Sequence, residues 1–334
     1  MFLIAEIGQA HEGSLGIAHS YIDALAKTGV HAVKFQTHIA EAESSIFEPF
    51  RVKFSYEDQT RYDYWKRMEF TFEQWAGIKA HCEQVGLEFL SSPFSNAAVE
   101  LLEKLGVKRY KIGSGEVNNF LMLDQIARTG KPIILSSGMS NYDELDLSVN
   151  FLKSRGAEIK ILQCTTSYPT KPENWGLNVI PELKARYGLP VGFSDHSGEI
   201  YACLFAANMG AEILEFHAVF DKRMFGPDAP ASLNIDQIKQ LVKGIEQLEL
   251  AKNHPINKYD NSAFTDLKSI FEKSLSLNRA LPIGHILQFS DLEAKKPKGK
   301  GIDANMYEKV IGLKLIKEMG KSHFLNWNDL TEQL

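Results

Sequence analysis

The chain has few cysteines and no long apolar run, and both shortages exclude classes of protein. Its 334 residues include only 3 cysteines. Cys82, Cys164 and Cys203 lie far apart, and their odd number argues against a disulfide framework and for a reducing compartment. No apolar stretch is long enough to span a bilayer. The opening MFLIAEIG has no basic region before its short apolar run, so it predicts a strand and not a signal peptide. We therefore expect a cytoplasmic protein without membrane association.

The chain also has no excess of positive charge. The net charge is −5, from 37 Lys and Arg against 42 Asp and Glu, so no basic surface for nucleic acid is indicated. No GxGxxG fingerprint follows a strand-like run, which leaves dinucleotide binding without support. Hydrophobic residues at 44% and charged residues at 24% are ordinary for a globular protein. Any anion must therefore be bound by local lysines.

What the chain does contain is a regular alternation of strand-like runs and helix-like segments. Such alternation implies parallel strands with right-handed crossovers. Eight units predict an α/β fold, the closed (β/α)8 TIM barrel, whose active site lies at the C-terminal ends of its strands. Residues far apart in sequence would meet at that rim. The eight runs end at Glu6, Lys34, Ser92, Lys111, Ser136, Thr165–Thr166, Ser194–His196 and His217.

The barrel pattern does not fill the whole chain. We predict a catalytic barrel domain over residues 1–253, a polar linker over 254–269 and a small β-rich domain over 270–334. The last part contains an imperfect repeat, ILQFSDL at 286–292 and FLNWNDL at 324–330, which predicts two related halves.

One connection inside the barrel domain is unusually long. Residues 39–70 are rich in charged and aromatic side chains. Loops of this length are commonly functional lids, interfaces or disordered segments. The segment predicts either a cover over the barrel mouth or a surface that packs against another subunit.

Two lysines at strand ends carry the first chemical signal. Lys34 and Lys111 could grip a phosphate, form a Schiff base or make a surface salt bridge. The Schiff base needs a lysine with a depressed pKa and ranks second. Hydroxyls at neighbouring positions favour the phosphate grip, because a phosphate has several acceptor oxygens. These hydroxyls belong to Ser92, Ser114, Ser136 and Ser194.

Two histidines and two carboxylates complete the predicted rim. His196 and His217 end neighbouring strands, where two imidazoles could bind a divalent metal and leave positions for water and substrate. Oxygen-rich completion suits Mn²⁺ or Mg²⁺, and nitrogen ligands also suit Zn²⁺ or Co²⁺. Glu6 and Glu116 are candidate acid–base groups. Either could instead position a lysine or a sugar hydroxyl.

These residues lie in stretches that resemble the bacterial sialic acid (nonulosonic acid) synthases, of the N-acetylneuraminate or legionaminate type. The tail, with SLSLNRALPIGHIL and KKPKGKGI, resembles the family's C-terminal antifreeze-like (SAF) domain. The resemblance therefore covers nearly the full length. The matching barrel stretches, in the family's order, are AEIGQAHEGS (5–14), VKFQTH (33–38), SSPFS (91–95), YKIGSGE (110–116), KPIILSSGM (131–139), CTTSYPT (164–170), GFSDHS (192–197) and GPDAPAS (226–232).

The resemblance implies a phosphoenolpyruvate-dependent transferase that forms a C–C bond. Phosphoenolpyruvate would condense with the open-chain aldehyde of an N-acyl mannosamine-type sugar to give a nine-carbon 2-keto sugar acid and phosphate. The resemblance also implies a domain-swapped homodimer, in which the C-terminal domain of one subunit lies over the barrel of the other. Phosphoenolpyruvate would be held by Lys34, Ser92, Lys111, Ser114, Ser136 and Ser194.

The same resemblance assigns the metal and the sugar. His196 and His217 would bind the metal, expected to be Mn²⁺ with Mg²⁺ or Co²⁺ as alternatives. Glu6 or Glu116 would manage the attacking water or stabilise a developing cation. The sugar would be contacted by Gln36, Thr166, Tyr168, Asp228 and Lys296.

Two departures from the family leave the acceptor sugar open. Lys296 stands where the family commonly has an arginine that reaches the sugar's acyl group, and Thr166 stands where an asparagine is frequent. Lysine cannot reproduce the planar fork of arginine. Two other interpretations also stay open, a Schiff-base pyruvate aldolase and a non-catalytic sugar-phosphate binding protein. The physiological metal and the downstream glycan are not specified by the sequence.

Overall fold

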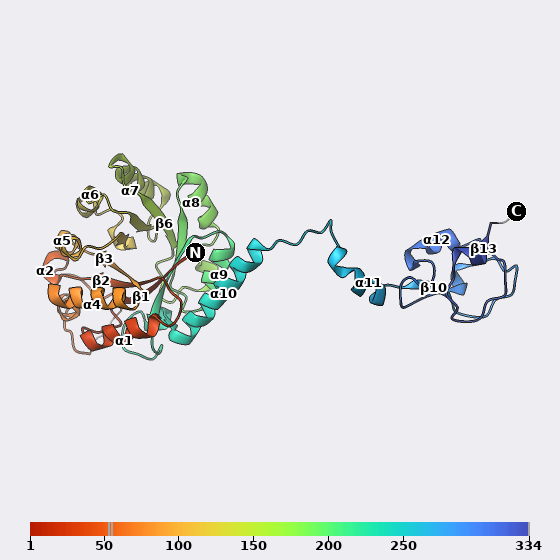
Figure 1. The fold of residues 1–334 in the computed structure, drawn as a ribbon. Coiled ribbons are helices and arrows are strands. Elements are labelled where there is room, and N and C mark those ends of the chain that lie inside the picture. Colours follow the sequence, from red (N-terminus) through yellow and green to blue (C-terminus); the bar gives the residue numbers. More distant parts are fainter. Residues whose placement is uncertain (53, 55, 333–334) are drawn as a thin grey trace. The chain divides into compact units, whose positions relative to one another are not determined.

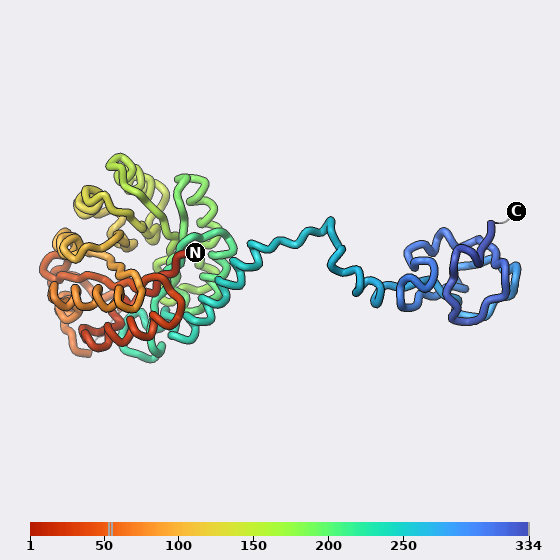
Figure 2. The backbone as a smooth tube through the Cα atoms, in the orientation of Figure 1, coloured from red at the N-terminus to blue at the C-terminus, as the bar shows by residue number. Residues whose placement is uncertain are grey.

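The computed structural model describes residues 1–52, 54 and 56–332, and the chain separates into two compact units. The first unit comprises Met1–Asn253 and the second comprises His254–Leu334. In Figure 1 the first unit runs from red to cyan and the second from cyan to blue. Figure 2 follows the same path as a tube.

The first unit is built around eight parallel strands. The hydrogen-bonded order is β3-β2-β1-β8-β7-β6-β5-β4, and β3 also contacts β4, so the sheet curls round until its edge strands meet. This arrangement confirms the predicted (β/α)8 TIM barrel. A short strand, β9 (Leu233–Asn234), extends β8. The barrel strands are β1 (Phe2–Gly8), β2 (Ala32–Thr37), β3 (Glu88–Pro93), β4 (Tyr110–Ile112), β5 (Ile133–Ser136), β6 (Ile159–Cys164), β7 (Val191–Asp195) and β8 (Ile213–Val219).

Helices surround the strands of this unit (Figure 1). The Ser14 hydroxyl accepts a hydrogen bond from the backbone N–H of Ile17 and caps the first helix, as its place in the sequence predicts. Within the described residues, no helix combines the length and the apolar character that crossing a bilayer requires. The helices are α1 (Leu15–Leu25), α2 (Ala40–Glu43), α3 (Arg61–Met68), α4 (Phe72–Gln84), α5 (Asn96–Leu105), α6 (Phe120–Arg128), α7 (Tyr142–Ser154), α8 (Val179–Tyr187), α9 (Ile200–Asn208) and α10 (Ile235–Asn253).

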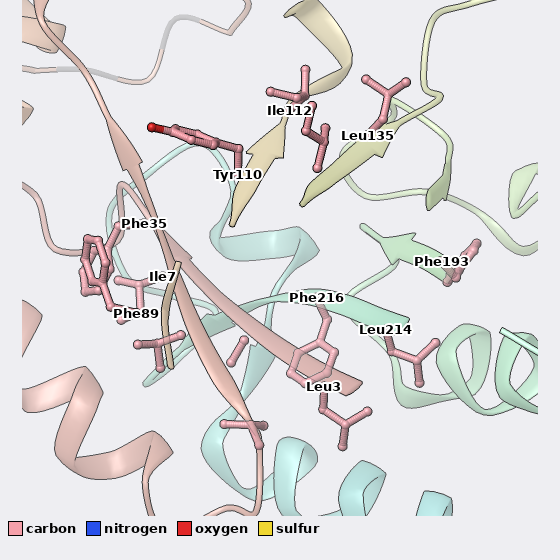
Figure 3. Packing of buried hydrophobic residues seen from close by; sticks show 14 of the residues in the cluster. Leu3, Ile7, Phe35, Phe89, Tyr110, Ile112, Leu135, Phe193, Leu214 and Phe216 are labelled. Carbon is pink, nitrogen blue, oxygen red and sulfur yellow. The ribbon is translucent and has the colours of Figure 1, made fainter. Parts of the chain in front are cut away.

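Alternation along each strand sorts the side chains into two environments, because successive residues point to opposite faces. The outward residues pack under the helices, and Figure 3 shows this core around Leu3, Ile7, Phe35, Phe89, Tyr110, Ile112, Leu135, Phe193, Leu214 and Phe216. The inward residues near the amino ends of the strands form a separate apolar plug. The plug consists of Ile4, Ala32, Leu90, Ile134, Leu162 and Ile213, with the partly buried Phe2 packed against it.

The second unit is small and β-rich. Its two antiparallel sheets enclose a core that includes Leu277, Leu287, Val310 and Leu325. A short helix, α11 (Thr265–Phe271), begins inside the segment that we expected to be a linker. The other elements are β10 (Ser274–Leu277), β11 (Leu292–Lys295), α12 (Tyr307–Val310), β12 (Lys314–Leu315) and β13 (Leu330–Thr331).

The imperfect sequence repeat folds into the same local structure twice. The 3₁₀ turn Phe289–Asp291 leads into β11, and the 3₁₀ turn Trp327–Asp329 leads into β13. Both turns begin with a capping box, in which side chain and backbone satisfy each other's hydrogen bonds. The aspartate that closes each box is buried. The spacing shared by the two sequence stretches therefore has a structural cause.

Candidate active site

A cavity of about 390 Å³ lies at the carboxyl ends of the barrel strands, a size within the usual range for small-molecule sites. Every predicted site residue except Lys296 lines it. Lys296 belongs to the second unit, where its Nζ lies 4.8 Å from the centre of the Phe271 ring. The predicted residues that line the cavity are Glu6, Lys34, Gln36, Ser92, Lys111, Ser114, Glu116, Ser136, Thr166, Tyr168, Ser194, His196, His217 and Asp228.

The period of the strands explains why these residues share one level. On β1, Ile4 belongs to the apolar plug, and Glu6 comes two residues later on the same face. Glu6 pairs in register with Lys34 on β2 and with His217 on β8. The polar floor of the cavity is thus the layer directly above the plug.

Four buried charges form the centre of this floor. Lys34 Nζ lies 2.6 Å from Glu6 Oε1 and 3.6 Å from Glu215 Oε1. Lys111 Nζ lies 3.3 Å from the same Glu215 oxygen. All four side chains are at most 3% exposed. Two ammonium groups face two carboxylates, so the floor is formally balanced. Removing a single member would leave an uncompensated buried charge.

Burial and neighbouring charges shift the pKa values of these groups in different directions. Burial acts to lower the pKa of Lys34, but Glu215 and Glu6 outweigh it and raise the pKa. Burial lowers the pKa of Lys111, and Lys34 adds to this effect. Burial acts to raise the pKa of Glu6, but His217, Lys34 and Lys111 together lower it. Glu6 and Lys34 therefore form a lasting ion pair, and Lys111 is the more easily neutralised amine.

His196 and His217 meet at the mouth of the barrel. Their ring centres are 5.3 Å apart, and Tyr168 packs 4.3 Å from the His196 ring. His217 Nε2 lies 3.3 Å from Glu6 Oε2. Burial, and then the charge of His217, hold the pKa of His196 well below its ordinary value. Its ring nitrogens are thus kept neutral, as metal ligation requires.

Glu116 lies apart from the central charges. It ends the 3₁₀ turn Ser114–Glu116 that follows β4, and its Oε2 accepts a 2.7 Å hydrogen bond from Asn119 Nδ2. Burial raises its pKa, and the bond from Asn119 only partly offsets this. A carboxyl group with a raised pKa is better placed than Glu6 to exchange a proton.

Glu215 is a central residue that the sequence reasoning missed. It bridges the two lysines and accepts a 3.0 Å hydrogen bond from Ser194 Oγ. Its other oxygen, Oε2, has no hydrogen-bond partner within the described part of the chain. A signal was available, because Glu215 precedes His217 by two residues and must share its face of β8.

Residues 39–70, hereafter the cover segment, also contribute to the cavity. Arg51 Nη2 lies 2.8 Å from Asp228 Oδ1, and its guanidinium lies 4.2 Å from the Tyr168 ring centre. This segment therefore reaches the loop after β8, which agrees with a cover over the mouth. Its described residues that line the cavity are Glu43, Glu48, Arg51, Arg61 and Trp65.

The fold and the cavity together define the class of protein. Buried lysines, carboxylates and imidazoles from many strands converge where barrels of this kind hold their active sites. The class is therefore a (β/α)8-barrel enzyme.

Comparison with known proteins assigns the family within that class. The chain matches the NeuB family model over residues 21–257. It is 34% identical over 316 residues to the N,N'-diacetyllegionaminic acid synthase of Campylobacter jejuni, covering 93% of this chain and 94% of that protein. It is 31% identical over 319 residues to the human N-acetylneuraminate-9-phosphate synthase, covering 94% and 88%. The chain belongs to the NeuB family.

A solved structure agrees with this assignment. The crystal structure of N-acetylneuraminic acid (sialic acid) synthetase from Leptospira borgpetersenii, in complex with citrate, matches with a TM-score of 0.70 at 29% identity. The match covers 80% of this chain and 89% of that one.

Proposed function

We propose that this chain is a nonulosonic acid synthase that condenses phosphoenolpyruvate with the open-chain aldehyde of an N-acyl mannosamine-type sugar. The observation that carries the proposal is the buried floor, where Lys34 and Lys111 line the same cavity as the imidazoles of His196 and His217. The names of the relatives, which are sialic and legionaminic acid synthases, supply the class of product.

The floor suits the anionic substrate. Lys34 Nζ lies 3.4 Å from Ser92 Oγ, and Lys111 Nζ lies 2.8 Å from Ser136 Oγ. Ammonium and hydroxyl groups at one level offer several donors to the carboxylate and phosphate of phosphoenolpyruvate. Ser114 and Ser194 line the same cavity and would add two more donors.

We propose that a divalent cation binds at the mouth. Among the described residues no group of three or more His, Cys, Asp or Glu side chains could hold a metal ion, so the protein would supply only part of the shell. His196 and His217 would provide two nitrogen ligands, and water and substrate oxygens would complete the shell. We propose Mn²⁺, with Mg²⁺ or Co²⁺ as alternatives. When bound, the ion supplies Lewis-acid polarisation of the aldehyde.

The protein's own groups account for the remaining chemistry. C3 of phosphoenolpyruvate bonds to the aldehyde carbon, whose oxygen takes a proton from solvent water and becomes a hydroxyl. C2 is left cationic, and the ionised Glu6, held by Lys34, is placed to stabilise it. Water adds to C2 and loses a proton to Glu116. The C2–O bond to phosphate then breaks, the C2 hydroxyl passes its proton to the departing phosphate, and the ketone remains.

Replacing Glu116 by glutamine tests this division of labour. Glu116→Gln should lower kcat by about 10²–10³-fold, the usual effect of losing a general base, with both KM values within about threefold. Steady-state phosphate release measures both parameters. Glu88→Gln, at the amino end of β3, is the matched control and should leave them unchanged. A rise in KM without loss of kcat would contradict the assignment.

The sugar would lie above the floor, between the strands and the cover segment. We propose that Gln36, Thr166, Tyr168 and Asp228 contact it, since all four line the cavity. We further propose a homodimer, in which the second unit of one chain brings Lys296 to the barrel of the other. The three cysteines are buried and free, which supports a cytoplasmic location.

Arg51→Ala tests how the cover segment acts on the sugar. Losing the partly exposed pair with Asp228 and the contact with Tyr168 removes about 1 kcal/mol, or about fivefold. The KM for the sugar should rise by that factor, and the KM for phosphoenolpyruvate should not change. Arg186→Ala is the matched control, because Arg186 makes the same kinds of contact, with Asp146 and Tyr142, away from the cavity. An equal rise in both KM values would exclude a role specific to the sugar.

The test of the function itself is phosphate release from phosphoenolpyruvate with Mn²⁺. N-acetylmannosamine and 2,4-diacetamido-2,4,6-trideoxymannose should be compared as acceptors. Release that depends on one of them supports the synthase and assigns its subclass. The lowered pKa of Lys111 favours a second candidate, a Schiff-base pyruvate aldolase. Borohydride trapping of pyruvate on Lys111, with no phosphate release, would establish the aldolase instead.

A further inference from the structure

We propose that His38 is a positioning residue that fixes the amide of Gln36, and that it ties this amide to the cover segment. The inference rests on the proposed function, in which Gln36 contacts the sugar. His38 directly follows β2 and is only 3% exposed, yet it lines the cavity. A buried imidazole needs hydrogen-bond partners, and its partners identify what it does.

The orientation of the Gln36 amide follows from the carboxylate below it. Gln36 Nε2 donates a 2.8 Å hydrogen bond to Glu6 Oε1. The same Glu6 oxygen lies 2.6 Å from Lys34 Nζ, and an oxygen paired with an ammonium group acts as an acceptor. Only the nitrogen of the amide can face it, so Gln36 Oε1 must point the other way, toward His38 and Gln9.

His38 meets this amide oxygen from the side of the cover segment. Its Nε2 lies 3.1 Å from Gln36 Oε1 and 3.3 Å from Gln9 Nε2, which itself donates to Gln36 Oε1 at 2.5 Å. With Nδ1–H donated to Glu43 Oε1 at 2.5 Å, a neutral ring accepts from Gln9 and a protonated ring donates to Gln36. In either protonation state the ring forms a hydrogen bond with one of the two side-chain amides, Gln9 or Gln36.

The ring cannot turn away from these partners. Trp65 stacks on one side with ring centres 3.9 Å apart, and Phe94 lies 4.5 Å away, each at 15° to the imidazole plane. Glu43 is 7% exposed and lies on α2, and Trp65 lies on α3. Both helices belong to the cover segment. Packing of the cover segment against the barrel therefore fixes the position of the His38 ring. The His38 ring in turn holds the Gln36 amide in its hydrogen bond to Glu6.

His38→Phe separates this role from a merely structural one. Phenylalanine keeps the stack with Trp65 and Phe94 but cannot form the hydrogen bonds. The KM for the sugar should rise by about tenfold or more, the scale of losing hydrogen bonds to a charged group, while the KM for phosphoenolpyruvate stays within about twofold. The double variant His38→Phe/Glu43→Gln should retain the sugar defect and recover any thermal stability lost through the unpaired Glu43. His31→Phe, at the amino end of the barrel, is the matched control.

The outcomes are distinct. A sugar KM that stays within twofold in His38→Phe overturns the proposal. A parallel rise of both KM values with a fall in Tm, restored together by Glu43→Gln, shows a structural role and also overturns it. If the wild-type enzyme releases no phosphate with any acceptor, the proposed function fails. The positioning role of His38 is then tested by crystal structures of the wild type and of His38→Phe. Gln36 Nε2 still bonded to Glu6 in His38→Phe would then refute positioning, and a turned amide would support it.

Discussion

Lys34→Met should cost the protein both its activity and a large part of its stability. Lys34 is the shared partner of Glu6 and Glu215, and all three side chains are at most 3% exposed. Removing the cation leaves two buried carboxylates, and breaking a buried pair in this way costs about 3–5 kcal/mol. We expect the free energy of unfolding, measured by urea denaturation, to fall by that amount. Phosphate release should fall to background.

Lys111→Met is the variant whose loss of stability should be compared with that of Lys34→Met. Burial already lowers the pKa of Lys111, and Glu215 would keep Lys34 as a partner. The loss of stability should therefore be smaller than for Lys34→Met, although activity should again be lost. Lys108→Met, at an exposed position before β4, is the control and should affect neither property. Equal destabilisation by the two floor variants would show that the pairing has been assigned wrongly.

Removing divalent metal should have an effect on activity as large as removing Lys34. A chelator should reduce phosphate release by roughly 10³-fold, because Lewis-acid assistance supplies several kcal/mol, and Mn²⁺ should restore it. His196→Asn and His217→Asn should both weaken Mn²⁺ binding, which the loss of the free-ion electron paramagnetic resonance signal measures directly. His19→Asn alters a histidine that pairs with His81 instead, and it should bind Mn²⁺ normally. Full activity in chelator would refute the metal requirement.

The barrel and most of its candidate site could be predicted from two features of the sequence. These are the regular alternation of strands and helices, and the polar residues at the strand ends. A strand end is visible in sequence, and a polar residue there must face the mouth, so the sequence predicts the place of Lys34, Lys111 and His217 without their partners. Glu215 obeys the same rule but lies one step deeper on β8 than His217. The end of the strand-like run marks His217 and not the inward-facing residue two positions before it.

Other parts of the site depend on contacts between distant segments, which no local pattern encodes. Arg51 meets Asp228 across 177 positions of sequence, and this contact exists only once the cover segment has packed. His38 is two residues from Gln36 in sequence, but the role proposed for it depends on Trp65 and Phe94, which stack on its ring. Lys296 remains a prediction, because it belongs to the second unit.

The layering of the barrel has a consequence for how such an enzyme can diversify. The apolar plug and the charged floor belong to strands, where a change of one side chain disturbs several neighbours at once. The groups proposed to face the sugar lie mostly on connections, as Thr166, Asp228 and Arg51 do. Connections tolerate substitution and insertion far better than packed strands do. A lineage could therefore drift from one acceptor to another by mutation of its loops while it inherited the chemistry below them unchanged.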